Sequence, residues 1–524
     1  GGPIESKQRR LESPTYVPDS GFLVKKRRSR YGEFLHSSES IMHTELAETG
    51  KLQELLGRLG AGLDTFQEFT HLDAQHPSKD WQSQLTTALP QQGEGIDSVL
   101  DTLIQQVVAN GSPVPKPGFT SYITTGATTI ATLATTAASV ASPQRYMLTA
   151  FNLLEELSLQ WMAEMFSLGA MQGVYSSGGS VANLVAMGAA RQSAFERIGI
   201  DPAANGVTRP VSIYASTECH HTIQRAAGVL GLGRRAVKAI ACDDQGRMRA
   251  SELVRAIEAD LANDILPMAI VANAGTTNTG AIDPLAKIGA IAKQYGIWFH
   301  VDGAYGLPGI LDERISHLFA GLELADSVIV DPHKWLGASV GVAATYVHDR
   351  ELLRRAFTQE PADYLEGTAL QEGEPSARVE HSLDDFGIPY FDYGVELSAP
   401  CRGVVVWAMI REIGVTGLRQ RMRRHNDMAA FIVTFAEDYP QLEILLAPTL
   451  SICCFRYVSE GVADLDRLNQ RLHRQLVREN QYMPSTTRVK GQLALRPCFV
   501  GARHEQDQVE GLMAAVLRIG ATLL

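Results

Sequence analysis

Three groups of residues combine side chains and spacing that could carry out chemistry. Asp302 directly follows the apolar run 299–301, and Lys334 comes shortly after a second apolar run, 327–330. The glycine-rich stretch 176–180 precedes an alanine-rich segment at 181–194. A glycine turn before a helix can direct backbone N–H groups at a phosphate. Taken singly, Asp302 could be a surface cap and Lys334 an exposed charge, so their combination is what indicates a site.

That combination matches the needs of pyridoxal 5'-phosphate (PLP). PLP requires a lysine for a Schiff base, a carboxylate at the pyridinium nitrogen and a cradle for its phosphate. A carboxylate beside the ring nitrogen favours the protonated form, which then acts as an electron sink. Lys334, Asp302 and the turn at Gly179 and Ser180 could supply these groups in this order. The sequence therefore predicts PLP as a cofactor.

The region around these residues reads as an α/β fold. Between residues 110 and 400, short β-branched runs alternate with alanine-rich segments, with strands expected at 211–214, 268–271, 297–301 and 327–330. Strands of this length separated by helices predict a largely parallel sheet covered on both faces. Such sheets bind ligands beyond the carboxyl ends of their strands, which is where Asp302 and Lys334 are expected.

Four regions are predicted along the 524 residues. Residues 1–45 form a polar arm that could be disordered, and its basic cluster at 25–30 could instead bind an acidic partner or act as a targeting signal. Residues 46–110 form an N-terminal helical segment, because leucines recur at helical spacing between 52 and 59. Residues 111–400 form the large cofactor domain. Residues 401–524, with short strands at 444–446 and 452–457 and a final helix, form a small α+β domain.

Composition excludes several classes of protein. A net charge of -11 argues against a dedicated nucleic-acid binder. No apolar run reaches 18 residues, so no membrane-spanning helix is expected. Six cysteines without a CxxC pair fit free thiols in a reducing compartment better than a disulfide framework or a zinc site. The prediction is a cytoplasmic protein without a metal site.

Four motifs, in this order, resemble those of the group II PLP decarboxylases, which include the aromatic amino acid, glutamate, cysteine sulfinate and 2,4-diaminobutyrate decarboxylases. The motifs are Ser-Gly-Gly-Ser-x-Ala-Asn at 177–183, Asn-Ala-Gly-Thr-Thr-Asn-Thr-Gly-Ala-Ile-Asp-Pro at 273–284, His-Val-Asp-Gly-Ala-Tyr-Gly at 300–306 and Asp-Pro-His-Lys-Trp at 331–335. The resemblance extends from about residue 110 to the C-terminus. It implies a fold-type I PLP enzyme whose large domain holds a mostly parallel, seven-stranded sheet.

The resemblance also implies roles for individual residues. Lys334 would form the internal aldimine, Asp302 would pair with the pyridinium nitrogen, and His220 would stack on the pyridine ring. The remaining cofactor contacts would come from Gly179, Ser180, Thr276, Ala304 and His333. Tyr364, on a loop after the lysine, would protonate the quinonoid carbanion at Cα. The substrate-binding residues would be Phe119, Tyr122, Ile123 and Ser398.

The implied reaction is decarboxylation of an L-amino acid to its amine, by a homodimer with the active site at the subunit interface. Relatives that form aldehydes tend to carry phenylalanine in place of the loop tyrosine, or a changed stacking histidine. This chain keeps both Tyr364 and His220, which favours simple decarboxylation. Three alternatives remain: an aldehyde-forming oxidative decarboxylase, another PLP lyase, and a non-catalytic PLP-binding homologue.

Two features bear on the substrate side chain. Ile123 stands where aromatic amino acid decarboxylases tend to have a second aromatic residue, which disfavours an aromatic substrate. Acidic residues recur between 366 and 385 and could favour a substrate with a second amine, such as 2,4-diaminobutyrate. A solvated charge run explains these acids at least as well.

Overall fold

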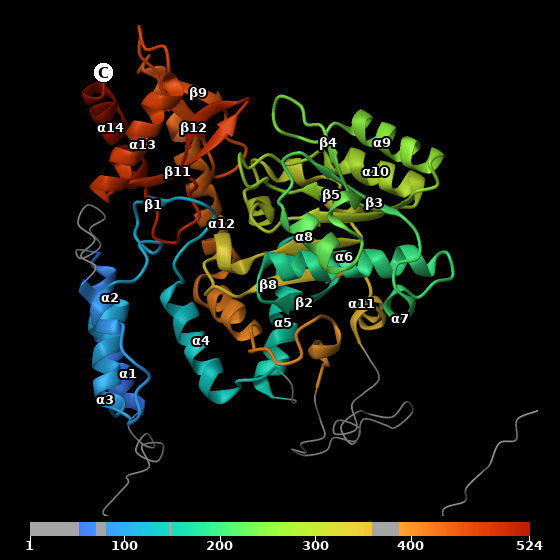
Figure 1. Ribbon diagram of the computed structural model, residues 1–524, viewed down its shortest axis with the longest axis horizontal. Coiled ribbons are helices and arrows are strands. Elements are labelled where there is room, and N and C mark those ends of the chain that lie inside the picture. Colours follow the sequence, from blue (N-terminus) through green and yellow to red (C-terminus); the bar gives the residue numbers. More distant parts are fainter. Residues whose placement is uncertain (1–51, 70–79, 146–148, 359–386) are drawn as a thin grey trace, which may run out of the picture.

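The computed structural model describes residues 52–69, 80–145, 149–358 and 387–524, and its largest feature is a seven-stranded sheet (Figure 1). Its strands, in spatial order, are β2 (Gln172–Ser176), β8 (Ala343–Val347), β7 (Ser327–Val330), β6 (Trp298–Asp302), β5 (Leu266–Asn273), β3 (Val211–Ser216) and β4 (Val237–Ile240). Only β8 runs antiparallel to its neighbours; the pairings from β7 to β4 are parallel. The prediction of a mostly parallel, seven-stranded sheet is confirmed.

The central strands are buried on both faces. Every residue of β6 and β7 is buried, and so are seven of the eight residues of β5. Because successive side chains of a strand point to opposite faces, complete burial means that both faces are covered. The helices that follow the strands of this part are α6 (Gly179–Glu196), α7 (Pro202–Asn205), α8 (Thr222–Val229), α9 (Ala250–Ala262), α10 (Leu285–Tyr295) and α11 (Arg350–Phe357).

Helix α6 lies close to the sheet because its inward residues are small. Ala182, Ala186, Ala189 and Ala190 are all fully buried, and the helix contacts β2, β5, β6, β7 and β8. Alanine combines high helix propensity with a short side chain, so the backbone can approach the sheet closely. This packing places the first turn of α6 next to the ends of β6 and β7, where the site lies.

A second group of helices connects the part of the chain that holds the seven-stranded sheet to the C-terminal part. Helices α4 (Thr129–Ala141) and α5 (Ala150–Met165) pack against α12 (Gly403–Glu437). Helix α12 is interrupted at Gly414, whose φ of 65° lies in the left-handed region that glycine adopts most easily. The half of α12 after this interruption contributes Met428, Ala429 and Ile432 to a separate hydrophobic core in the C-terminal part.

The C-terminal part contains a five-stranded sheet in the order β1-β11-β12-β10-β9. Its elements are β9 (Leu442–Leu446), β10 (Cys454–Tyr457), α13 (Leu465–Glu479), β11 (Met483–Val489), β12 (Gln492–Arg496) and α14 (Gln506–Thr522). Strand β1 (Phe119–Thr120) comes from much earlier in the chain and pairs in parallel with β11. The predicted domain boundaries stay a prediction, but β1 ties the 111–400 region to the C-terminal sheet.

The described part of the predicted N-terminal segment is helical. It contains α1 (Leu52–Gln67), α2 (Asp80–Leu85), α3 (Ile96–Thr102) and a π-helical turn, η2 (Leu103–Val108). Figure 1 shows these helices to one side of the molecule, away from the seven-stranded sheet. The polar arm 1–45, Tyr364 and the acidic run 366–385 lie outside the described residues.

Three features of the described residues bear on the expectations from composition. No helix there is long and apolar enough to cross a membrane. All six cysteines are free thiols. Within the same residues, no three histidine, cysteine, aspartate or glutamate side chains are grouped so that they could hold a metal ion.

Candidate active site

A cavity of about 380 Å³ opens where β5, β6 and β7 end. Seven of the predicted cofactor residues line it, namely Gly179, Ser180, His220, Asp302, Ala304, His333 and Lys334. They come from the start of α6, from the loop after β3, from the end of β6 and from the segments after β6 and β7. The fold thus brings together the groups that the sequence places far apart, at the edge of the sheet where ligands of such folds bind.

One side of the cavity is suited to an anion. Helix α6 begins at Gly179 and has no side-chain cap at its N-terminus, so its first N–H groups face the cavity without a capping partner. The helix dipole adds partial positive charge there. A Cβ atom on Gly179 would lie 2.6 Å from Asp331 Oδ2, so a larger residue here requires the Asp331 side chain to shift. These features fit the phosphate of PLP.

His333 lies close to this anion site. Its Nδ1 lies 2.6 Å from the carbonyl oxygen of Val342 and must donate to it, which leaves Nε2 as the unprotonated nitrogen. Burial lowers the pKa of His333, so the neutral imidazole is the favoured form.

Asp302 provides a fixed carboxylate in the cavity. It is the last residue of β6 and only 7% exposed. Its Oδ1 accepts the N–H of Ala304 at 3.1 Å, and its Oδ2 accepts the side-chain N–H of Asn183 at 3.0 Å. Ala304 carries only a methyl group, which leaves space for a flat ring. A buried carboxylate held in place by two donors is well oriented to pair with a pyridinium nitrogen.

Lys334 projects its amine into the same cavity. The residue lies in a π-helical turn, η7 (Pro332–Leu336), and its φ and ψ of -96° and -107° break the helical path. Its Nζ lies 3.0 Å from Oδ2 of Asp331, a residue that is only 1% exposed. The other oxygen, Oδ1, is buried and has no hydrogen-bond partner among the described residues. Asp331 stands first in the motif at 331–335, but the sequence alone predicts no role for it.

His220 is held by the residue two positions after it. Its Nδ1 lies 3.0 Å from the hydroxyl of Thr222, and burial lowers the pKa of His220, which favours the neutral imidazole. A neutral, oriented ring can stack on a flat cofactor without adding charge. Thr222 and Asn183 also line the cavity, yet neither was assigned a role from the sequence. Asn183 could have been found, because it stands inside the quoted motif at 177–183.

The other predicted residues that the structure describes lie outside the lining of this cavity. Thr276 is buried, its hydroxyl accepts the N–H of Ala281, and its neighbours Gly275 and Thr277 face the cavity instead. The four predicted substrate residues, Phe119, Tyr122, Ile123 and Ser398, do not line it within a single chain.

Arg496 connects one of these residues to the rim of the cavity. Its buried guanidinium donates to the carbonyl oxygens of Tyr122 and Asn278, each at 2.9 Å, and also to that of Thr277. The loop that carries Tyr122 therefore lies beside the rim, although its side chain is 68% exposed. The roles of the four substrate residues stay predictions.

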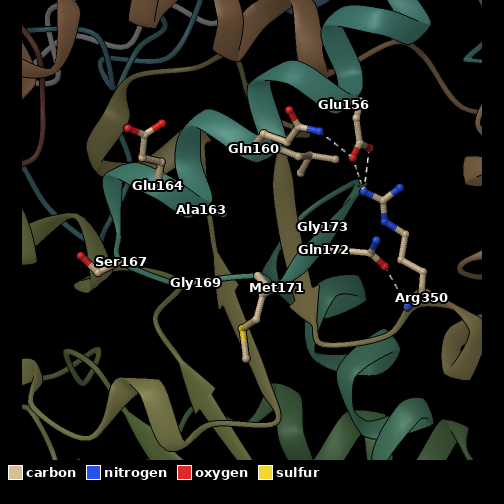
Figure 2. Close-up of a pocket in the computed structure, with 12 residues that line it drawn as sticks. Glu156, Gln160, Ala163, Glu164, Ser167, Gly169, Met171, Gln172, Gly173 and Arg350 are labelled. Atoms are coloured by element: carbon tan, nitrogen blue, oxygen red, sulfur yellow. Dashed lines mark hydrogen bonds and ion pairs between the residues drawn. The ribbon is translucent and has the colours of Figure 1, made fainter.

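A second cavity, of about 490 Å³, lies between α5, the turn that follows it and Arg350. Figure 2 shows that its main polar groups point at one another. Arg350 makes two hydrogen bonds to Glu156, at 2.8 and 2.6 Å, and Gln160 donates to the same carboxylate. These groups are already paired, and none of the predicted site residues lies here, so we assign the chemistry to the first cavity.

The chain is similar to known PLP enzymes over most of its length. Residues 77–458 match the family model described as the pyridoxal-dependent decarboxylase conserved domain. An aromatic-L-amino-acid decarboxylase of Cavia porcellus is 30% identical over 71% of this chain and 75% of its own. One of Bacillus atrophaeus is 28% identical over 83% of this chain and 87% of its own.

The fold has solved counterparts as well. The crystal structure of Oryza sativa TDC with PLP and tryptamine superposes with a TM-score of 0.80, covers 91% of this chain and 98% of its own, and is 21% identical. The expected fold type is thereby confirmed. The chain belongs to the pyridoxal-dependent decarboxylase family and is a PLP-dependent carboxy-lyase that acts on an amino acid.

Proposed function

We propose that Lys334, Asp302 and His220 carry out the decarboxylation of an L-amino acid to its amine in the cavity at the ends of β5, β6 and β7. One observation carries this proposal. A lysine amine, a buried carboxylate and the uncapped start of α6 line a single cavity of about 380 Å³. These are the three groups that PLP chemistry requires of a protein.

Each residue has a distinct task in this proposal. Lys334 would hold PLP through its amine until the substrate amine replaces it, and PLP would supply an electron sink for the electron pair left at Cα when carbon dioxide leaves. Asp302 keeps the ring nitrogen protonated, since a nearby carboxylate favours the charged form. The neutral imidazole of His220 covers one face of the ring and excludes water. Asp331 holds the lysine amine when it is free, because the two groups lie 3.0 Å apart.

The proton that replaces carbon dioxide at Cα is proposed to come from Tyr364. This assignment rests on the sequence resemblance, because Tyr364 lies outside the described residues. Replacing Tyr364 with phenylalanine should reduce amine formation and divert product towards aldehyde. Amine yield that stays at the wild-type level, without aldehyde, would remove Tyr364 from the mechanism. Product analysis of the wild type also decides between simple decarboxylation and the aldehyde-forming alternative.

The active unit is proposed to be a homodimer with the site at its interface. The predicted substrate residues do not line the cavity of a single chain, as expected if a second copy completes it. Large apolar side chains are also exposed next to this side of the fold: Leu133 and Val140 on α4, Leu153 on α5, and Val340 at the cavity itself. Apolar side chains that are exposed in a single chain could be covered by a second copy. Light scattering should give twice the chain mass of 57.0 kDa.

The first substrate class to test is aromatic L-amino acids. The two curated relatives described above are named for such substrates, and the exposed ring of Tyr122 lies 6.3 Å from that of Phe119 near the cavity rim. Against this stands Ile123, at a position where aromatic residues are usual. A mixture of aromatic, acidic and diamino acids, analysed for the amine that appears, decides the matter. Amine formed only from 2,4-diaminobutyrate would favour the acidic-run hypothesis instead.

Replacement of Asp302 with asparagine tests the proposed site directly. The variant keeps the shape of the side chain but loses the charge, so kcat should fall by about 100-fold or more. Bound PLP should also become easier to dialyse away. The matched control is Asp64→Asn, which makes the same replacement of one carboxylate oxygen by an NH2 group at an exposed aspartate on α1. If Asp302→Asn retains wild-type kcat and PLP affinity, the cavity is not the site of the reaction.

A further inference from the structure

Asn183 makes hydrogen bonds to three other side chains at the centre of the site. It lies in the first turns of α6 and is only 1% exposed. Its Nδ2 lies 3.0 Å from Asp302 Oδ2 and 3.0 Å from Thr222 Oγ1, and its Oδ1 lies 2.9 Å from His300 Nε2. A buried amide with every donor and acceptor in use is firmly oriented.

The directions of these hydrogen bonds follow from Asp302. An ionised carboxylate only accepts hydrogen bonds, so the atom of Asn183 that faces it must be the NH2 group. The carbonyl oxygen of Asn183 then faces His300 and accepts from its Nε2. Burial lowers the pKa of His300 to about 4, so the ring is neutral and has a single N–H. That N–H is on Nε2.

Two further residues behind His300 support this tautomer. Nδ1 of His300 lies 2.9 Å from the hydroxyl of Ser327 and, being unprotonated, accepts from it. The oxygen of Ser327 in turn accepts from Trp298 Nε1 at 2.8 Å. Ser327 and His300 are fully buried, so water does not compete for these bonds. The hydrogen bonds thus form a chain from Trp298 through Ser327, His300 and Asn183 to Asp302. In each of them the donor lies on the Trp298 side and the acceptor on the Asp302 side.

A second branch leads from Asn183 to His220. The other N–H of the amide donates to Thr222 Oγ1, so the hydroxyl of Thr222 is free to donate to His220 Nδ1, which lies 3.0 Å away. His220 then carries its proton on Nε2. One amide thereby sets the orientation of both the carboxylate and the imidazole that the proposed function places against the cofactor.

We propose that Asn183 is a positioning residue that joins Asp302 and the Thr222–His220 pair into one hydrogen-bonded unit, supported by His300. Asn183 acts through these partners, and the inference rests on the roles proposed for Asp302 and His220. Loss of an outer hydrogen bond to a charged group in a site of this kind weakens ligand binding or activity by roughly 10- to 100-fold.

The decisive variants are Asn183→Asp and Asn183→Leu, compared at about pH 5 and about pH 8. An aspartate at this position sets a second carboxylate 3.0 Å from Asp302 at high pH, but its protonated form can donate and restore the bond. The dissociation constant of PLP from the folded variant should therefore rise by roughly 10- to 100-fold at about pH 8 and recover at about pH 5. The leucine variant should lose affinity at both values.

The control is Asn469→Asp. Asn469 is fully buried in the C-terminal part and donates to the carbonyl oxygens of Tyr457 and Leu465, so the same substitution perturbs packing far from the cavity. It should leave PLP affinity unchanged relative to the wild type at both pH values. If Asn183→Asp keeps wild-type affinity at about pH 8, the proposal is refuted. Equal, pH-independent loss in both Asn183 variants would also refute it, because that result indicates packing alone.

If the Asn183 variants do not fold, a more conservative substitution, Thr222→Val, still tests the proposal. Thr222→Val preserves the shape of the side chain but breaks the branch to His220. It should lower kcat by roughly 10-fold with little change in the dissociation constant of PLP, and an unchanged kcat would overturn the second branch. Asp302→Asn distinguishes the proposed function of the cavity from the positioning role of Asn183. If Asp302→Asn loses PLP while Asn183→Asp does not, only the role of Asn183 is refuted.

Discussion

Glu155 on α5 should make the stability of the fold depend on pH. Its side chain is fully buried, and one carboxylate oxygen accepts the N–H of Gly403 at the start of α12 at 2.5 Å. The other oxygen is buried without a hydrogen-bond partner among the described residues. Burial raises the pKa of Glu155 from 4.5 to about 7, although Arg145 and Arg402 oppose the shift. The folded chain therefore holds a proton at pH values where the unfolded chain has released it.

The sign and size of the effect follow from this shift. A raised carboxyl pKa stabilises the folded state below the unfolded pKa, and the stabilisation is lost as pH rises through the folded value, between about 4.5 and 7. At 1.36 kcal/mol per pKa unit, the contribution should fall by about 2 to 3 kcal/mol between about pH 5 and about pH 8. Glutamine at this position has no proton to release, so the Glu155→Gln variant lacks this pH-dependent contribution to the free energy of unfolding.

Denaturant unfolding of both proteins at the two pH values measures the effect. The free energy of unfolding of Glu155→Gln, relative to the wild type, should increase by about 2 to 3 kcal/mol from about pH 5 to about pH 8. Other titrating groups are common to both proteins and cancel in the difference. Glu164→Gln, an exposed change on the same helix, is the control and should show no such trend. The reasoning fails if the difference for Glu155→Gln is the same at both pH values.

Three further changes have defined outcomes. Gly179→Ala places a methyl group 2.6 Å from Asp331 Oδ2 and should cost about 1–3 kcal/mol of stability and weaken PLP binding, as measured by thermal unfolding and dialysis. Arg496→Met frees the rim carbonyls that Arg496 now holds and should raise KM more than it lowers kcat in steady-state assays. Trp335→Phe removes the donor to buried His425 Nδ1 at 2.8 Å and should cost about 1–3 kcal/mol in denaturant unfolding, with a less-than-additive effect in the double variant with His425→Leu.

The sequence predicted the parts of the fold that depend on local pattern. The runs at 211–214, 268–271, 297–301 and 327–330 form β3, β5, β6 and β7 because continuous apolar residues of strand length are buried on both faces. The alanine-rich segment at 181–194 forms most of α6. Motif order likewise identified Lys334 and Asp302 as neighbours in space.

Pairings between distant segments could not be predicted in this way. Strand β1 has only two residues, and its partner β11 lies in the C-terminal part, so no local periodicity in the sequence predicts this pairing. Arg496 reads as one more charge in a strand, yet it is buried and bonded to three carbonyl oxygens. Asn183 was visible in a motif, but its role depends on His300 and Thr222, which meet it only in the folded chain.

The site has two parts that are held by different contacts, one on the sheet and helix α6 and one at the rim of the cavity. Asp302, Asn183 and His300 belong to the sheet and to the helix packed on it, where burial and a complete set of hydrogen bonds make each orientation costly to change. The rim is held instead by the guanidinium of Arg496 from β12, which donates to loop carbonyl oxygens and to the hydroxyl of Ser485 in β11. Because hydrogen bonds to loop carbonyls do not depend on side-chain identity, residues such as Tyr122 can be exchanged without disturbing the sheet. Changes in substrate preference are therefore expected from rim substitutions, and changes in cofactor binding from substitutions in the sheet.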